Sequence, residues 1–229
     1  MKRQIVLDTE TTGLDIKSGH RIIEIGCIEL KERKFTGKYF HTYLNPQRNI
    51  DKESFSIHGI TQNFLKEKPF FKDIAIGFLE FIKYSELIIH NAEFDINFLE
   101  YEFKLIDNPI FLRNYCSIFD TLVFARKKYP GRRNTLNALC KRYKIDISDR
   151  NFHGALLDAK ILAVLYLEMT SGQTSLFKEE KIEQNFSNYK NDDINQDDIL
   201  ISHSPIIYAD SEELKIHNKF INFLEKNFK

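Results

Sequence analysis

The chain has 229 residues, of which 42% are hydrophobic and 29% are charged, a composition typical of a soluble globular protein. No apolar run is long enough to cross a bilayer and the first residues show no secretory signal, so we expect a cytoplasmic protein that does not bind membranes. Basic and acidic residues both number 33. This zero net charge argues against a protein that holds nucleic acid by its own net charge, so a nucleic-acid substrate would be delivered by a partner.

The three cysteines, Cys27, Cys116 and Cys140, are odd in number and far apart. They form neither a disulfide framework nor a Cys-x-x-Cys pair. We therefore expect reduced thiols in the core.

The first half of the chain predicts strands with short helices between them. An apolar strand at residues 5–7 runs directly into Asp8. A mostly apolar stretch at 21–30 predicts a strand covered on both faces, with a hairpin partner at 38–44 and the turn near Gly37. Helices are expected at 51–57, 62–67 and 71–84, and an apolar strand at 87–90.

The second half predicts further alternation of helix and strand. Asn91 is well suited to cap a helix over 92–105, and a short strand follows at 117–119. Helices are then expected at 120–128, 135–143 and 155–170. This order predicts an α/β fold whose mixed central sheet is flanked by helices, with a compact domain over residues 1–172.

The C-terminal part of the chain differs in composition. Residues 178–203 are crowded with polar and charged side chains, so we expect a flexible linker within the segment 173–209. Beyond it, residues 210–213 resemble a capping box and apolar residues recur at helical spacing. Residues 210–229 therefore predict an amphipathic helix that binds a partner.

Asp8 and Glu10 are the first candidate site residues. Side chains alternate along a strand, so these two carboxylates point to one face and repel each other. A hard divalent cation between them would relieve this repulsion, and protonation of one carboxyl is the other solution. The alternative is that both are ordinary solvated acids at the end of a strand.

Three further residues can be read in the same way. Asp95 falls near the start of a predicted helix, where the dipole favours an anion, and Asp158 lies in the first turns of another. His153 precedes Asp158 by five residues, so the two converge only if His153 lies on the loop before the helix. Taken singly, Asp95 could be a helix-dipole residue and His153 a surface histidine.

Together these residues resemble a known family. Asp8-x-Glu10, His90-Asn91-Ala-Glu-Phe-Asp95 and His153-Gly-Ala-Leu-Leu-Asp158 are similar to the three motifs of the DEDDh exonuclease superfamily. That superfamily has a ribonuclease H-like fold. The run of motifs and the chain length resemble, more closely, the family of epsilon subunits, which are the proofreading 3′–5′ exonucleases of bacterial DNA polymerase III.

The resemblance implies a two-metal hydrolysis that releases nucleoside 5′-monophosphates from a mispaired DNA 3′ end. Two Mg²⁺ or Mn²⁺ ions would be held by Asp8, Glu10 and Asp158 on one side and by Asp8 and Asp95 on the other. His153 would be the general base. Substrate contacts are implied for the set Asp8, Glu10, Glu53, His58 and Asp158, with Thr9 to Thr12 lining the same pocket.

The resemblance also implies partners. Gln173-Thr-Ser-Leu176-Phe177 is similar to the peptides that bind the bacterial sliding clamp, through the polar Gln173 and the pair Leu176 and Phe177. In that family a C-terminal segment binds the polymerase (alpha) subunit, a role implied here for residues 210–229. A small accessory subunit of the theta kind is a further candidate partner.

Two other functions remain open from the sequence. A related ribonuclease that trims RNA 3′ ends would carry the same catalytic residues, because selection of DNA or RNA depends on contacts at the 2′ position. A non-catalytic adaptor that joins polymerase to clamp would keep the fold, but the presence of all five catalytic residues argues against it.

Overall fold

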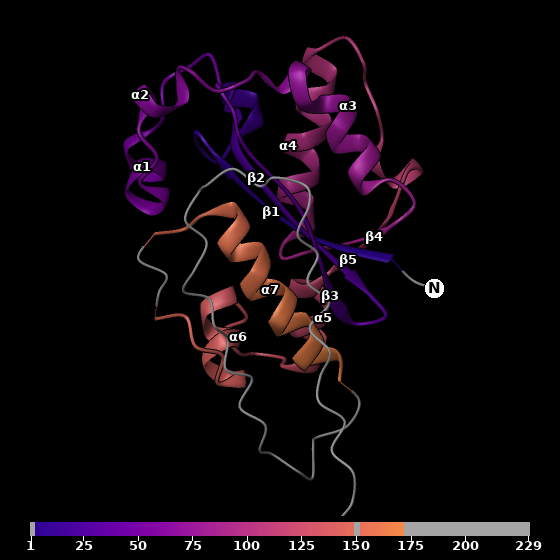
Figure 1. Ribbon diagram of the computed structural model, residues 1–229. Helices are drawn as coiled ribbons and strands as arrows, with labels where there is room; N and C mark the ends of the chain where they lie inside the picture. The colour runs from indigo at the N-terminus through magenta and orange to yellow at the C-terminus, as the bar shows by residue number, and fades with distance from the viewer. Residues whose placement is uncertain (1–2, 149–151, 172–229) are drawn as a thin grey trace, which may run out of the picture. The chain divides into compact units, whose positions relative to one another are not determined.

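The structure, a computed structural model, describes residues 3–148 and 152–171. Its centre is a mixed five-stranded sheet with the strand order β3-β2-β1-β4-β5 (Figure 1). The predicted clamp peptide, linker and terminal helix lie outside the described residues.

The sheet combines an antiparallel half with a parallel half. β1 pairs antiparallel with β2 and parallel with β4; β2 pairs antiparallel with β3, and β4 parallel with β5. Because β1, β4 and β5 are parallel, their carboxyl ends meet at one edge, where α/β folds place ligands. The strands are β1 (Arg3–Thr11), β2 (Ile22–Lys31), β3 (Lys34–Tyr43), β4 (Glu86–Ile89) and β5 (Ser117–Asp120).

The turn between β2 and β3 lies earlier in the chain than the sequence predicted. Glu32 and Arg33 both have positive φ, at 52° and 64°, and form a two-residue turn of the kind that fits the twist of a hairpin. Gly37, where the turn was expected, lies within β3 with φ at 82°. A glycine at this position therefore corresponds to an irregular part of the strand and not to the turn.

The helices follow the predicted order, with ends shifted by a few residues at most. Asp120 and Thr135, which were expected inside helices, are instead their capping residues. The helical segments are α1 (Lys52–His58), α2 (Gln62–Leu65), α3 (Phe71–Ile82), α4 (Ala92–Leu105), α5 (Thr121–Lys128), α6 (Leu136–Tyr143) and α7 (Ala155–Thr170), with short 3-10 turns η1 (Ile16–Ser18) and η2 (Leu112–Asn114).

The two faces of the sheet carry separate cores. Ile5 and Leu7 of β1 face a cluster that includes α3 and α4, whereas Val6 faces a cluster built with α5, α6 and α7. Figure 1 shows α7 lying along β1 and β2, apart from α3 and α4. By strand alternation, Asp8 and Glu10 share the face of Val6, which is the face covered by α7.

The start of α4 is not capped as the sequence suggested. Asn91 has φ at 71° and makes no side-chain cap hydrogen bond. The Asp120 carboxylate, from the end of β5, instead accepts hydrogen bonds from the backbone N–H of Ala92 at 3.0 Å and of Leu122 at 2.7 Å. One side chain therefore caps α5 and supports the first turn of α4.

The prediction that the cysteines lie in the core is confirmed, since Cys27, Cys116 and Cys140 are all buried. Among the described residues, no helix is both long and apolar enough to span a bilayer.

Candidate active site

The site is built where the start of α7 meets the sheet. Asp8 on β1 lies opposite Gly26 on β2. A Cβ atom at position 26 would lie 2.3 Å from the backbone nitrogen of Leu156. Glycine at this position thus lets the first turn of α7 pack directly on the strand beside Asp8, which brings the side chains at the start of α7 toward β1.

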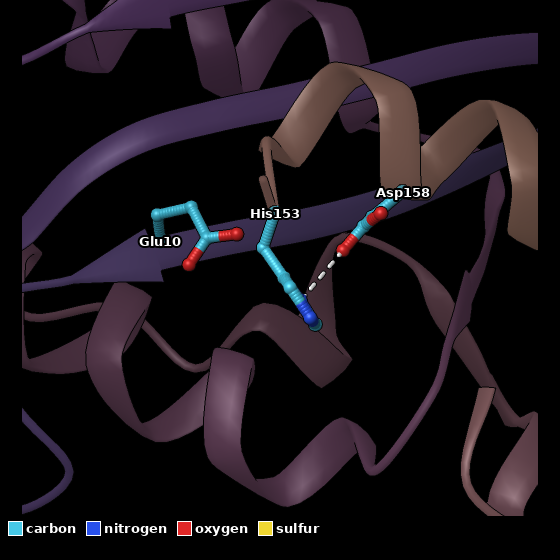
Figure 2. Close-up of side chains that lie close together, drawn as sticks. All are labelled: Glu10, His153 and Asp158. Carbon is cyan, nitrogen blue, oxygen red and sulfur yellow. Dashed lines mark ion pairs between the residues drawn. The ribbon is translucent and has the colours of Figure 1, made fainter. Parts of the chain in front are cut away.

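Glu10, His153 and Asp158 converge at this point, as Figure 2 shows. Each offers a ligand atom, and these atoms all lie within 4.8 Å of one another. Nδ1 of His153 lies 3.2 Å from Oδ2 of Asp158. His153 lies on the loop before α7, as its spacing from Asp158 required, and its side chain is 42% exposed while that of Asp158 is buried.

The loop that carries His153 is held by the end of α1. The backbone N–H of His153 donates to the carbonyl oxygen of Ile57 at 3.1 Å. The Phe152 ring lies against Gly59, whose φ of 68° and close contact both favour glycine. These contacts fix the position of His153 beside the segment that contains His58.

Asp95 lies in the first turn of α4 and is buried. Its Oδ1 accepts a hydrogen bond from Oγ1 of Thr9 at 2.7 Å. Burial raises the pKa of the Asp95 carboxyl to about 7, against the lowering effect of the hydrogen bond from Thr9. A carboxyl held in this way is readily neutralised, by a proton or by a cation.

Asp8 and Asp95 are not members of the group formed by Glu10, His153 and Asp158. Both nevertheless lie close enough to one buried thiol to affect its pKa. Burial raises the pKa of Cys27 well above its ordinary value, and the charges of Asp8 and Asp95 raise it further. The two carboxylates, from β1 and α4, therefore lie in the same neighbourhood.

His58 ends α1 and is buried. Its Nδ1 accepts a hydrogen bond from the backbone N–H of Ile60 at 3.0 Å, so the ring proton of the neutral form lies on Nε2. Burial lowers the pKa of His58, as does the charge of His153. Nε2 is buried and has no hydrogen-bond partner among the described residues, which makes it a donor held ready for another molecule.

The other predicted substrate contacts differ in how they lie. Glu53 is exposed in the first turn of α1. The hydroxyls of Thr9, Thr11 and Thr12 are bonded inside the protein, to Asp95, to the carbonyl of Gly13 and to His20 respectively. The threonine hydroxyls thus shape this region from within.

Glu24 is a residue near the site that sequence reasoning missed. It lies opposite Glu10 in the β1–β2 register and is 2% exposed. Nε2 of His41 lies 2.8 Å from its Oε1, and Oε2 has no hydrogen-bond partner among the described residues. The available signal was a single acidic residue within the otherwise apolar run Ile22 to Ile25.

The residues present fit a divalent metal. Carboxylates from β1, α4 and α7 and one imidazole gather at one edge of the sheet, and hard cations prefer such oxygen ligands. Like charges at this distance need a neutralising partner, which a metal supplies.

The fold and this group of side chains are those of a nuclease class, and comparison with known proteins agrees. A model of the family described as Exonuclease (RNase_T) matches residues 5–166. A solved structure of Exonuclease X in complex with 5′ overhanging duplex DNA matches with a TM-score of 0.58 and 26% identity, over 75% of this chain and 94% of that one. The sheet with its flanking helices is therefore the ribonuclease H-like exonuclease fold.

Curated relatives define the branch of this class. The DNA polymerase III subunit epsilon of Buchnera aphidicola subsp. Schizaphis graminum is 50% identical over 98% of both chains. That of Escherichia coli (strain K12) is 54% identical over 76% of this chain and 74% of its own. The chain belongs to the exonuclease family and, within it, to the DNA polymerase III epsilon subunits.

Proposed function

We propose that this exonuclease is the proofreading subunit of a replicative DNA polymerase and removes mispaired 3′-terminal nucleotides as 5′-monophosphates. The convergence of Glu10, His153 and Asp158 carries the proposal, because it joins a candidate general base to metal-binding carboxylates. The names of the relatives favour DNA as the substrate over RNA.

Asp8, Glu10 and Asp158 would hold one divalent ion, Mg²⁺ or Mn²⁺, and Asp8 with Asp95 would hold a second. When bound, these ions would activate the attacking water and stabilise the leaving oxygen. The Asp95 carboxyl, with a pKa near 7, would give up its proton as the ion binds.

His153 would take the proton from the attacking water. Its Nδ1 faces Asp158, so a proton on Nδ1 leaves Nε2 as the basic nitrogen. The hydrogen bond from the backbone N–H of His153 to the carbonyl oxygen of Ile57 holds the backbone that carries the ring in place for this step. His58, with its Nε2 proton preset by Ile60, would donate a hydrogen bond to the terminal nucleotide, and Glu53 would contact the same nucleotide.

The double variant Asp8→Ala with Glu10→Ala tests the proposal. We expect it to release no nucleotides from a 5′-labelled single strand in Mg²⁺, while the native chain does so and stops when a chelator is added. The matched control is Glu67→Ala with Glu80→Ala, which removes two exposed carboxylates away from the site. Near-native release by the Asp8 and Glu10 variant would contradict the metal site.

Substrate selection is tested on the native chain with matched and mismatched primer ends and with an RNA of the same sequence. Faster release from the mismatched DNA end supports proofreading. Faster release from RNA would instead favour a ribonuclease.

The proposal includes partners for the C-terminal part of the chain. Residues 210–229 would bind the polymerase (alpha) subunit, residues 173–177 would bind the sliding clamp, and a theta-like subunit would bind the exonuclease domain, all in the cytoplasm. Deleting residues 204–229 should preserve exonuclease activity on single strands and abolish copurification with the polymerase. Retained copurification would contradict this assignment.

A further inference from the structure

The neutral net charge of the chain hides a strongly basic segment. Residues 121–144 contain eight Lys and Arg residues and no Asp or Glu. This segment forms α5, α6 and the loop between them. The segment therefore holds eight of the 33 Lys and Arg residues of a chain whose net charge is zero.

A cavity of about 450 Å³ opens on this segment. Arg126 of α5 and Arg132 of the following loop line it, together with Asn134. His90 and Asn91, which follow β4, form the wall nearest to the start of α4. The cavity therefore lies at the carboxyl ends of the parallel strands, the same edge of the sheet that carries the acidic residues.

The walls of this cavity are held by internal hydrogen bonds. His90 Nδ1 lies 2.9 Å from Oγ1 of Thr121, and the ring also bonds to the backbone of Asn134. The Asn134 side chain donates to the carbonyl oxygens of Tyr129 and Arg132 and accepts from Arg142. These bonds fix the loop at 129–135 against the end of β4.

Arg126 and Arg132, which line the cavity, differ from two other basic residues of the segment. Arg142 bonds to Asn134, and Lys128 donates to the carbonyl oxygen of Met169, so these two charges support the fold. Arg126 and Arg132 are exposed residues, and neither forms an ion pair with any residue in the described ranges. Two cations at one cavity without acidic partners are suited to bind an anion.

The cavity adjoins the acidic site. Asn91 lines the cavity, and Asp95 lies four residues later in the first turn of α4, which is roughly 6 Å along a helix. Successive phosphates of one DNA strand are separated by roughly 3.4 Å along a duplex axis. A strand whose terminal phosphodiester lies at the acidic residues would thus bring its next phosphates to the cavity.

We propose that the cavity lined by Arg126 and Arg132 binds the phosphodiester groups immediately 5′ of the scissile bond, so that the substrate strand leaves the active site across α5 and α6. This inference rests on the proposed nuclease function and names the path of its substrate. Arg126 and Arg132 bind phosphate without base contacts, so the cavity accepts any sequence. Lys127 and Arg133, which follow these arginines in sequence and are exposed, add positive charge to the same segment.

The test compares a small substrate with a strand. The p-nitrophenyl ester of thymidine 5′-monophosphate has a scissile phosphodiester but no upstream phosphates. A labelled single strand of ten nucleotides has a scissile phosphodiester and upstream phosphates. For Arg126→Ala with Arg132→Ala, we expect kcat/KM on the strand to fall roughly 10- to 100-fold. Hydrolysis of the ester should stay at the native level.

Charge and salt provide further controls. The double variant Lys72→Ala with Lys104→Ala removes two exposed positive charges outside the basic segment and should behave as the native chain on both substrates. The slope of log affinity for the strand against log salt should decrease by roughly 0.7 for each phosphate that the arginine variant no longer neutralises. Arg126→Lys with Arg132→Lys should recover part of the affinity, because it keeps the charge.

Equal effects of the arginine variant on ester and strand, or native activity on both, would overturn the inference. If the native chain hydrolysed neither substrate, the proposed nuclease function would fail. The cavity would still be tested by fluorescence anisotropy of a labelled single strand in chelator. Weaker binding by the arginine variant, but not by the lysine control, supports the cavity, and unchanged binding overturns it.

Discussion

Gly26→Ala tests how α7 is positioned. The added Cβ would lie 2.3 Å from the nitrogen of Leu156 and 2.4 Å from the carbonyl carbon of Ala155, where ordinary contact begins at 3.4 Å. Both contacts are with backbone, so no side chain can rotate away. The start of α7 must therefore move away from β2 by about 1 Å.

This movement should reach the chemistry. Asp158 lies in the first turn of α7 and faces His153, so both residues would shift relative to Glu10 on β1. A misplacement of about 1 Å can reduce a rate by roughly 100-fold. We expect a loss of that order in kcat for nucleotide release, with a smaller change in KM, and a loss of about 1–3 kcal/mol in the free energy of unfolding from overpacking.

The assay is steady-state nucleotide release from a single strand at a temperature well below the melting point of the variant. Gly77→Ala is the matched control, because a Cβ at this exposed position in α3 meets nothing within 4 Å. It should retain activity and gain about 0.5–1 kcal/mol in stability. If Gly26→Ala kept native activity and native melting, the positioning of α7 by Gly26 would be refuted.

Two further predictions concern the same site, and a third concerns a buried ion pair elsewhere in the domain. His153→Ala should lose roughly 100- to 10,000-fold in rate while divalent metal still raises its melting temperature; native activity would contradict its role as base. The folded-state pKa of Asp95 is raised from 3.8 to about 7, so its contribution to stability falls as pH rises through that window. In chelator, Asp95→Asn should therefore have a higher melting temperature than the native chain at pH 8 but not at pH 4. Its nucleotide release in Mg²⁺ should be lost. A difference in melting temperature that did not change with pH would contradict the raised pKa of the buried Asp95 carboxyl. Arg21→Ala should lose about 3–5 kcal/mol in urea unfolding, because it leaves the buried Glu102 carboxylate, which accepts two hydrogen bonds from Arg21, without its cation; a loss below about 1 kcal/mol would contradict this.

Several features could be predicted because they depend on residues close in sequence. Alternation along β1 placed Asp8 and Glu10 on one face, and the five-residue spacing placed His153 on the loop before Asp158. Periodic apolar residues located the helices to within a few positions.

Other features could not be predicted because they depend on contacts between distant segments. Asn91 is a residue type that commonly caps helices, but Asp120 from the next strand supplies the capping carboxylate. Gly37 is a residue type that is common in turns, but the pairing register of β2 and β3 places the turn at Glu32 and Arg33. In both cases tertiary pairing overrode a local preference.

The net charge shows the difference most clearly. A sum of zero over the whole chain predicted that a substrate strand would need delivery by a partner. The sequence already groups eight Lys and Arg residues at 121–144, and the fold places Arg126 and Arg132 of this segment at a cavity beside the start of α4, so local charge and net charge lead to different expectations.

The sequence by itself determined the chemical groups of this protein, their order along the chain and the family to which they belong, because motifs and periodicity are local properties. Only the tertiary structure decided that Glu10, His153 and Asp158 meet within 4.8 Å and that the Asp95 carboxyl is buried with a pKa near 7. It also decided that Arg126 and Arg132 share a cavity. Distance and burial arise from the packing of α4 and α7 on the sheet, which brings together residues far apart in the chain.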